Sequence, residues 1–392
     1  MNAVQTTGAC QTTQNDSGPA LTTTATTGRT NWDPSGRAGI SVAVVTYNAA
    51  DYIRDILFDI SEQDFPPESF EVLIVDGGST DRTREIAVEC LRANAACTWR
   101  VLENQGRTLP CGWNIAISNA SLPFLLRLDA HSRMPSDFLN HCATALATGH
   151  FVAGGIVTTV SSSNISRLAR VAEMSRFCGS AAAFRRPVSA GLVDTLAYAA
   201  YHRSVFAAVG LFDERLTRNQ DNEMHFRMRK AGYQFYMDPA VRSQYRMRST
   251  FKAVLKQKFS NGYWGPLAMS VAPGCMAFRH LAPAALVMGL VALALIGALA
   301  GAWWPLLIYA VLYCGAGLRA SHADYREGRL TLFDALIAPL ASLPIHIVYG
   351  LGTIAGAISV PTFTQRHRNF QTNLELHKVV ASGGPAPAAS GS

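Results

Sequence analysis

With 392 residues and a formal net charge of +7, the chain can hold a substantial core plus a second module, and its basic excess suits anionic lipid or a pyrophosphate. No DNA- or RNA-binding motif accompanies this charge, so nucleic acid is excluded as an expected partner. The eight cysteines form no Cys-x-x-Cys pair, which argues against a zinc site or a disulfide framework and favours a reducing compartment.

Residues 1–37 are rich in Thr, Ser, Gly, Gln and Asn and nearly lack apolar residues, so we expect a disordered tail. They contain no apolar h-region and are not expected to act as a secretory signal. From residue 39 onward, strands and amphipathic helices alternate. Strands are predicted at 40–47, 71–75, 99–102, 123–128 and 151–159, and helices at 50–63, 82–91 and 111–120. Such βα units predict an α/β domain over 38–270 with a mostly parallel sheet.

Residues 161–195 give no clear prediction, because they are rich in Ser, Ala and Arg without a regular apolar period. A helix is expected over 221–231, closed by Gly232. A strand is expected over 233–237, halted by Asp238-Pro239.

Apolar runs lengthen and charges nearly vanish after residue 280, where 281–300 and 303–318 are each long enough to cross a bilayer. A loop over 319–332 carries Arg319, Arg326 and Arg329, and the positive-inside rule places it and the α/β domain in the cytoplasm.

A third apolar stretch, 336–360, is interrupted by Pro339 and Pro344. If it spanned the membrane, the tail would lie outside, yet the basic residues of that tail favour the inside. A full span and a re-entrant or in-plane segment therefore remain equal alternatives. The predicted organisation is a membrane region over 275–361 with two or three apolar helices, and a C-terminal tail over 362–392.

Four polar clusters follow predicted strands or open predicted helices, so they could gather at one edge of the sheet. They are Thr46-Tyr47-Asn48, Asp76 to Asp81, Asp129-Ala-His131 and Gln220 to Glu223. Open α/β sheets bind ligands at this edge. Because no Gly-Lys-Ser/Thr follows Asp76, this is not a phosphate loop of the Walker type. Its carboxylate suits a nucleobase or a ribose, although ordinary βα turns also favour Asp and Gly.

Asp129 and His131 supply a carboxylate and an imidazole two residues apart, which suits Mg²⁺ or Mn²⁺ shared with a diphosphate. The alternative is a helix-capping Asp beside a surface His. Asp221 is a candidate general base for a sugar hydroxyl, or an ordinary acidic residue at a helix N-terminus.

Other cationic and amide side chains are candidates for binding substrate oxygens. Arg107 and Asn114 bracket a turn and a helix start, where they could meet donor or acceptor oxygens. A further group of cations is expected to flank the cleft beside the membrane and to bind a lipid-linked pyrophosphate. This group is Arg185, Arg186, His202, Arg203, Arg246 and Arg248.

Together these clusters resemble family 2 glycosyltransferases of the GT-A fold. The matching segments are Val44–Asn48, Val75–Asp81, Arg127–His131 and Asn219–Glu223. Asp-Ala-His in place of Asp-x-Asp, the Val193-Asp-Thr195 segment, Val209–Asp213 and an apolar C-terminus are similar to the succinoglycan-biosynthesis, ExoA-like branch. The resemblance covers about residues 39–360. It implies a nucleotide-sugar-binding GT-A domain followed by transmembrane helices.

The resemblance also implies residue roles. Thr46 and Asp76 would contact the nucleobase, Asp129 the ribose and diphosphate, and His131 would help hold the Mg²⁺ or Mn²⁺. Asp221 would be the catalytic base. We add Tyr47, Asn48, Gly78, Ser79, Arg107 and Asn114 to the donor site, and Glu223, His202, Arg203, Arg246 and Arg248 to the acceptor or diphosphate site.

Three departures from the family pattern affect this reading. Ala49 stands where many relatives have Glu, so one donor contact is in doubt, and Gln220 replaces the first acid of the acidic pair. The segment 257–264 lacks the Gln-x-x-Arg-Trp of processive synthases, which favours addition of a single sugar.

The predicted activity is inverting transfer of one sugar, expected to be glucose, from a UDP-sugar to a polyprenyl-diphosphate-linked saccharide. It would serve exopolysaccharide synthesis at the cytoplasmic face of a bacterial-type inner membrane. The expected partners are the UDP-sugar, the lipid-linked acceptor, the lipid bilayer and other polysaccharide-assembly proteins. The alternatives are a polyprenyl-phosphate sugar transferase and a catalytically silent membrane scaffold, which the presence of Asp129, His131 and Asp221 disfavours.

Overall fold

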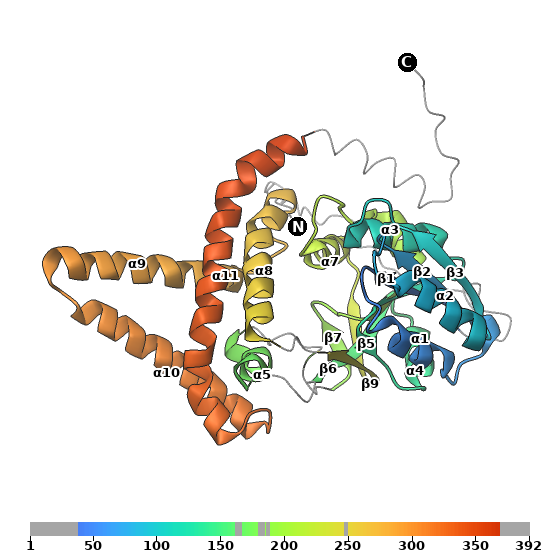
Figure 1. Ribbon diagram of the computed structural model, residues 1–392, viewed down its shortest axis with the longest axis horizontal. Coiled ribbons are helices and arrows are strands. Elements are labelled where there is room, and N and C mark those ends of the chain that lie inside the picture. Colours follow the sequence, from blue (N-terminus) through green and yellow to red (C-terminus); the bar gives the residue numbers. More distant parts are fainter. Residues whose placement is uncertain (1–37, 161–166, 179–184, 186–188, 247–249, 369–392) are drawn as a thin grey trace, which may run out of the picture.

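The computed structural model describes residues 38–160, 167–178, 185, 189–246 and 250–368. The tail predicted for 1–37, Arg186, Arg248 and residues 369–392 lie outside the described residues. The described chain has two parts: an α/β domain and a group of long helices beside it (Figure 1).

Nine strands of the described chain form one sheet, ordered β3-β2-β1-β4-β8-β6-β9-β5, with β7 paired to β9. Parallel pairing joins β3, β2, β1 and β4 in that order, and also joins β6 to β9. β8 runs antiparallel between β4 and β6, and β5 and β7 pair antiparallel with β9. The strands are β1 (Ile40–Thr46), β2 (Phe70–Asp76), β3 (Thr98–Glu103), β4 (Phe124–Asp129), β5 (Ser132–Arg133), β6 (Val152–Val160), β7 (Gly191–Val193), β8 (Ala199–His202) and β9 (Phe235–Arg246). The predicted mostly parallel sheet is confirmed.

Helices cover both faces of the sheet and bury two separate cores. One core holds Ile40, Val42 and Val44 of β1, and the other holds Ala43, as expected where side chains alternate along a strand. The first face is covered by α1 (Ile53–Ser61), α2 (Thr83–Asn94) and α4 (Phe138–Ala147), and the second by α3 (Leu109–Asn119), α6 (Arg203–Val209) and α7 (Gln220–Lys230). A 3₁₀ turn, η2 (Pro67–Ser69), precedes β2.

The strand predicted to stop at Asp238-Pro239 instead continues to Arg246. Its pairing with β6 shifts there, because Gly155 lies opposite Asp238 whereas Ile156 lies opposite Arg242. Residues 239–241 therefore form a bulge, where Pro is tolerated because it owes no N–H to the ladder. Gly155 lies so close to the Val241 backbone that a side chain would not fit.

The second part consists of long helices. It contains α8 (Phe251–Val271), the 3₁₀ turn η5 (Phe278–Leu281), α9 (Ala282–Ala300), α10 (Trp304–Arg326) and α11 (Leu332–Arg366), with α5 (Arg167–Met174) and the 3₁₀ turn η3 (Arg176–Cys178) against them. The helices Phe278–Ala300, Trp304–Arg326 and Leu332–Arg366 are each long and apolar enough to cross a membrane.

Two expectations for this region are corrected. Arg319 and Arg326 lie on α10 instead of in a loop, so the turn before α11 is short. Pro339 and Pro344 do not break α11, which is one helix of 35 residues. Neighbouring helices can stabilise such prolines by packing on the helix around the missing hydrogen bonds.

Candidate functional site

The polar ends of three parallel strands lie along one edge of the sheet. In the strand register Thr46 lies opposite Asp76, and Val45 lies opposite Asp129. β2, β1 and β4 are consecutive neighbours, so Asp76 and Asp129 are two strand spacings apart, roughly 10 Å. The structure therefore places three of the four predicted clusters, those that follow β1, β2 and β4, at the carboxyl edge.

The loops after β1 and β2 brace each other. The Asp76 carboxylate accepts hydrogen bonds from the backbone N–H of Ser79 (3.1 Å) and from its hydroxyl (2.6 Å). The Ser79 Oγ in turn accepts from the N–H of Asn48 (2.9 Å), and Asn48 Oδ1 accepts from the N–H of Thr80 (2.8 Å). Thr46 Oγ1 is buried with no partner in the described chain. Hydrogen bonds thus hold the two loops together, and the Thr46 hydroxyl keeps hydrogen-bonding capacity for a ligand.

Left-handed backbone conformations concentrate in these motifs. Asn48 (φ 48°), Arg107 (φ 54°) and Asn219 (φ 61°) are the non-glycine residues with positive φ in the described chain. Gly78 also has positive φ (75°), and a Cβ there would lie 3.3 Å from the Arg107 Nε, so the glycine lets this guanidinium cross the loop. Such conformations cost energy and cluster at binding sites. The structure thus brings Arg107 to the Asp76 loop.

Asp129 and His131 lie together at the end of β4. Asp129 Oδ2 is 3.9 Å from His131 Nε2, and their side chains are 35% and 40% exposed. The Tyr198 hydroxyl donates to Asp129 Oδ2 (3.3 Å). Burial, together with the Asp129 charge, raises the pKa of Tyr198 well above its usual value, so this phenol remains a donor.

This pair fits a divalent cation that is also held by substrate. No group of three or more His, Cys, Asp or Glu side chains suited to a metal occurs within the described residues. Mg²⁺ usually takes one or two carboxylates together with phosphate oxygens and water, and Asp129 could supply such a carboxylate.

Aromatic and cationic side chains surround His131. Its ring contacts Tyr245 (centroids 5.3 Å apart) and Tyr52 (6.4 Å). Arg246 lies over the Tyr52 ring (5.4 Å) and pairs with Asp55 (3.0 Å), and Arg185 lies over Tyr245 (5.6 Å). Two of the predicted cations therefore flank the Asp129–His131 pair.

His202 and Arg203 lie elsewhere. β8 runs antiparallel to β4, so His202 lies opposite Phe124 at the start of β4, about 16 Å along the strand from Asp129. His202 packs against Phe124 and caps α6, and burial lowers its pKa, which favours the neutral ring. Neither residue is brought to the predicted diphosphate site, because the strand that carries them points to the opposite edge.

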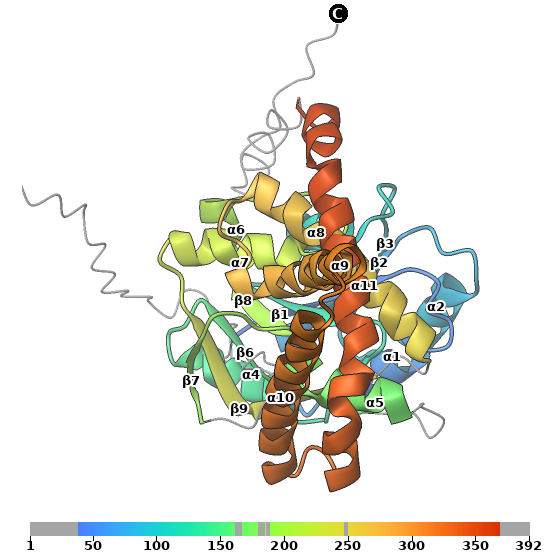
Figure 2. The same ribbon diagram turned by 90° about the vertical axis from the view of Figure 1, so that its left-hand side faces the viewer.

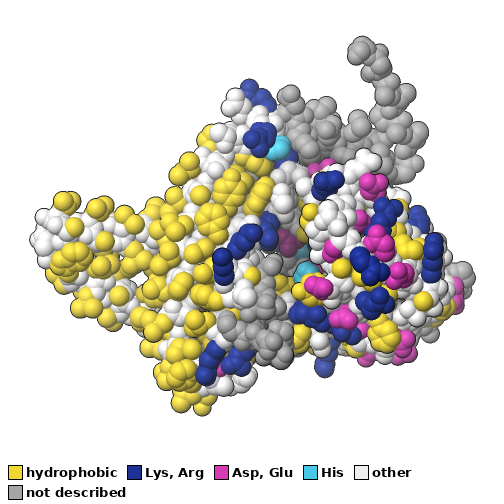
Figure 3. Space-filling model, in the orientation of Figure 1, with side chains coloured by type: hydrophobic (Ala, Val, Ile, Leu, Met, Phe, Trp, Pro, Cys, Tyr) yellow, Lys and Arg dark blue, Asp and Glu magenta, His cyan; other side chains and the backbone are white. Residues whose placement is uncertain are grey.

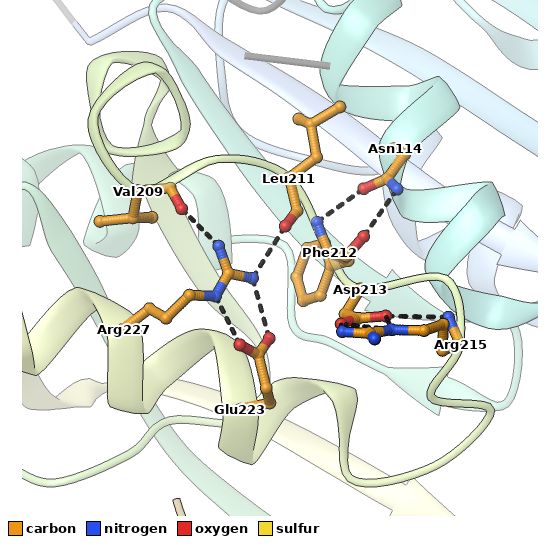
Figure 4. A network of polar contacts seen from close by, with 8 residues as sticks. All are labelled: Asn114, Val209, Leu211, Phe212, Asp213, Arg215, Glu223 and Arg227. Carbon is orange, nitrogen blue, oxygen red and sulfur yellow. Dashed lines mark hydrogen bonds and ion pairs between the residues drawn. The ribbon is translucent and has the colours of Figure 1, made fainter. Parts of the chain in front are cut away.

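Two predicted ligand-binding residues instead hold the loop 209–215 (Figure 4). Both Glu223 oxygens bind Arg227 (2.5 and 2.8 Å), and Arg227 also donates to the carbonyls of Val209 and Leu211. The Asn114 amide exchanges hydrogen bonds with the backbone of Phe212 (2.8 and 2.9 Å). Glu223 and Asn114 are buried and their polar atoms bind this segment, so they position it. Their substrate contacts stay predictions.

Asp221 is in the first turn of α7, half-buried. Its Oδ1 accepts from the N–H of Asn222 (2.9 Å), and no cation of the described chain pairs with it. The preceding cap residue, Asn219, donates to the backbone oxygen of Asn261 on α8 (3.3 Å). An unpaired carboxylate at a helix start, beside a helix of the second part, fits the predicted base.

Sequence reasoning missed a buried hydrogen-bonded chain beneath this edge. The Arg127 guanidinium lies between the rings of Trp113 (4.7 Å) and Phe212 (4.8 Å), with no carboxylate partner in the described chain. Its NH1 is 3.5 Å from the Tyr201 hydroxyl, which is 2.8 Å from His225 Nε2. The only signal was that Arg127 falls inside a family motif.

The chain continues to the Val-Asp-Thr segment. A guanidinium cannot accept, so the Tyr201 hydroxyl accepts from Arg127. The other ring nitrogen of His225, Nδ1, is 2.8 Å from Thr195 Oγ1, which belongs to this segment. Burial, with the charges of Arg127 and Arg229, lowers the pKa of His225 well below its usual value.

Comparison with known proteins matches the chain to one family. Residues 41–210 match the profile described as "Glycosyl transferase family 2". Over 234 residues the chain is 29% identical to the dolichyl N-acetyl-alpha-D-glucosaminyl phosphate 3-beta-D-2,3-diacetamido-2,3-dideoxy-beta-D-glucuronosyltransferase of Methanococcus voltae, covering 57% of this chain and 71% of that protein. Over 224 residues it is 28% identical to the succinoglycan biosynthesis protein ExoA of Rhizobium meliloti (strain 1021), covering 56% and 67%.

A solved structure shows the same fold. The mannosyltransferase PcManGT from Pyrobaculum calidifontis, in complex with GDP-Man and Mn²⁺, superposes with a TM-score of 0.54 at 21% identity and covers 80% of this chain and 88% of its own. The predicted GT-A type α/β fold is thereby confirmed.

Proposed function

Since the chain belongs to glycosyl transferase family 2, we propose that it moves one sugar from a UDP-sugar to a polyprenyl-diphosphate-linked saccharide. The observation that carries this proposal is the strand register that aligns Thr46, Asp76 and Asp129 along one edge of the sheet. We expect the sugar to be glucose and the product to be an exopolysaccharide intermediate, in keeping with the similarity to ExoA.

In this proposal the donor lies along the carboxyl edge. The nucleobase binds at Thr46 and Asp76, within the braced loops that include Tyr47, Asn48, Gly78 and Ser79. Arg107, which crosses Gly78, and Arg246, which flanks His131, supply positive charge for the diphosphate. Asp129 and His131 would hold Mg²⁺ or Mn²⁺, which when bound neutralises charge on the leaving diphosphate. PcManGT, solved with GDP-Man and Mn²⁺, supports a nucleotide-sugar donor and a divalent metal.

Asp221 then acts as the base. Its carboxylate takes the proton of an acceptor hydroxyl as that oxygen attacks the anomeric carbon. The bond from this carbon to the donor diphosphate breaks on the opposite face, so the configuration inverts and UDP leaves.

The acceptor's lipid explains the neighbouring helices. Leu216 of the loop before α7 and Phe226 of α7 pack in one apolar cluster with Trp264 of α8 and Phe363 of α11. The element that carries Asp221 thus lies directly on the helices of the second part. A saccharide whose lipid is confined to a bilayer would meet the base at this junction. We propose that residues 38–270 are the catalytic domain, on the cytoplasmic side.

Asp221→Asn tests the assigned base. It should abolish sugar transfer while UDP-sugar affinity changes little, because the amide cannot accept the acceptor proton. Asp137→Asn is the matched control: it makes the same change at the start of another helix, α4, where Asp137 pairs with His141 on the surface. Transfer and nucleotide binding by the purified protein are the measurements. Wild-type transfer by Asp221→Asn would overturn the assignment, and if it occurred with bare polyprenyl phosphate it would favour a phosphate acceptor, which needs no base.

A further inference from the structure

The third apolar helix, α11, is longer than a membrane crossing needs. Its 35 residues extend about 52 Å, whereas the hydrocarbon core of a bilayer is about 30 Å thick. The contacts of its two ends indicate whether α11 crosses the membrane or lies along its surface.

The first end of α11 is attached to α5. The Asp334 carboxylate, with a side chain only 2% exposed, pairs with Arg167 (2.6 Å) and Arg170 (3.0 Å). The end of α10 is held in the same way, because the fully buried Asp324 pairs with Arg176 of η3 (2.8 Å). The turn between α10 and α11 therefore lies beside α5 and η3, which come in the chain between β6 and β7 of the sheet.

The second end of α11 returns to the α/β domain. Phe363 packs against Trp264, with ring centroids 6.2 Å apart, in the cluster that includes Leu216 and Phe226. Phe226 belongs to α7, so this end lies beside the element that carries Asp221. Both ends of α11 are consequently on one side of the molecule.

The middle of α11 follows α8 along its length (Figures 1 and 2). Gly352 and Gly356 of α11 lie against the backbones of Phe259 and Tyr263, and Gly262 of α8 lies against Tyr349, so close that no Cβ would fit. Small residues allow this approach between helices. Gly350, near the middle of α11, contacts Pro283 at the start of α9, and α9 then runs away from the domain.

The outer side of α11 is a stripe of exposed apolar side chains. Leu336, Leu340, Leu351 and Ile358 are 58%, 68%, 46% and 74% exposed, and at 3.6 residues per turn they share one face. Figure 3 shows this hydrophobic surface continuing onto the projecting α9–α10 hairpin, with Lys and Arg gathered toward the α/β domain.

We infer that α11 lies in the plane of the membrane surface and does not cross the bilayer. Its stripe contacts lipid, α8 supports its other side, and only α9 and α10 enter the hydrocarbon. The occupant of the stripe is the bilayer, because the stripe is continuous with the apolar hairpin. Arg366 and Arg368, at the end of α11, then lie on the side of the α/β domain, as the positive-inside rule favours. The inference is independent of the sugar transferred.

Depth measurements on the full-length protein in liposomes test this arrangement. A fluorescent label is attached to an exposed cysteine introduced by Leu340→Cys or Ile358→Cys. Cys10, Cys97, Cys111 and Cys314 are replaced by serine, and the four remaining cysteines are buried. These two positions are 18 residues apart on the same face, about 27 Å along the helix. Quenchers fixed at different depths of the acyl chains then report how deeply each label lies. A matched control pair on α9, Met288→Cys and Leu299→Cys, is about 16 Å apart on one face.

An in-plane α11 predicts the same shallow depth at both of its positions, within the scatter of the method, and different depths for the α9 pair. A large difference in depth between Leu340 and Ile358 would mean that α11 crosses the bilayer and would overturn the inference. Absence of quenching at both positions, with normal quenching on α9, would mean that protein and not lipid covers the stripe, and would also overturn it.

Discussion

His225 is a fully buried histidine that links two motif segments, through Tyr201 to Arg127 and directly to Thr195. Its pKa is lowered in the folded state by burial, whereas the unfolded chain protonates near pH 6.5. Its contribution to stability is thus fully present above about pH 6.5. It is lost as pH falls toward the folded pKa, since only the unfolded state binds the proton there.

We therefore expect His225→Gln to flatten the loss of thermal stability between pH 7 and pH 5. One proton taken up on unfolding corresponds to a slope of at most about 1.4 kcal/mol per pH unit. Thermal unfolding in detergent, measured at several pH values, gives this slope. His141→Gln, at a surface histidine paired with Asp137, should keep the wild-type slope. Equal slopes for wild type and His225→Gln would contradict the role given to this buried ring.

Residues at strand ends were the most predictable part of the site. Asp76 and Asp129 each end an apolar run, and parallel strands carry such ends to one edge. His202 and Arg203 were misplaced because a sequence does not reveal that β8 runs antiparallel. The hydrogen-bonded chain through Arg127 was missed because Arg127 lies within β4, whose other residues before Asp129 are apolar.

At the scale of elements, the loop 209–215 depends on a buried ion pair. Glu223→Gln leaves Arg227 without its counter-charge, and we expect a loss of about 3 kcal/mol in unfolding free energy. Glu89→Gln, in the exposed pair with Arg82, should cost less than about 1 kcal/mol. Denaturant unfolding measures both. A stable Glu223→Gln protein with weakened acceptor binding would instead support the direct acceptor contact predicted for Glu223.

The strands of the parallel sheet were predicted because each is a short apolar run between turn residues. β9 was predicted too short because Pro239, a residue that normally ends a strand, lies in its bulge. α8 was not predicted. Its apolar residues pack against α5, α11 and α7 in turn, so no single apolar stripe appears, and it contains Gly262, Gly265 and Pro266.

At the scale of the molecule, the fold joins a GT-A type α/β domain to an apolar hairpin through α8 and α11. A third membrane span would put the C-terminal end of the chain outside, whereas the basic residues there favour the inside. An in-plane α11 removes this conflict, because the α10–α11 turn and the basic residues Arg366 and Arg368 then lie on the same side. This organisation places Asp221 beside the helices that we assign to the membrane surface.

The most direct test of the proposed function is a donor panel on the purified full-length protein. UDP-glucose, UDP-galactose, UDP-N-acetylglucosamine and GDP-mannose are each supplied with Mn²⁺ or Mg²⁺ and a polyprenyl-diphosphate-monosaccharide, and nucleotide release and lipid extension are measured. We predict metal-dependent extension by one sugar with UDP-glucose. Extension of bare polyprenyl phosphate alone, or no extension with any donor by the folded protein, would contradict the account.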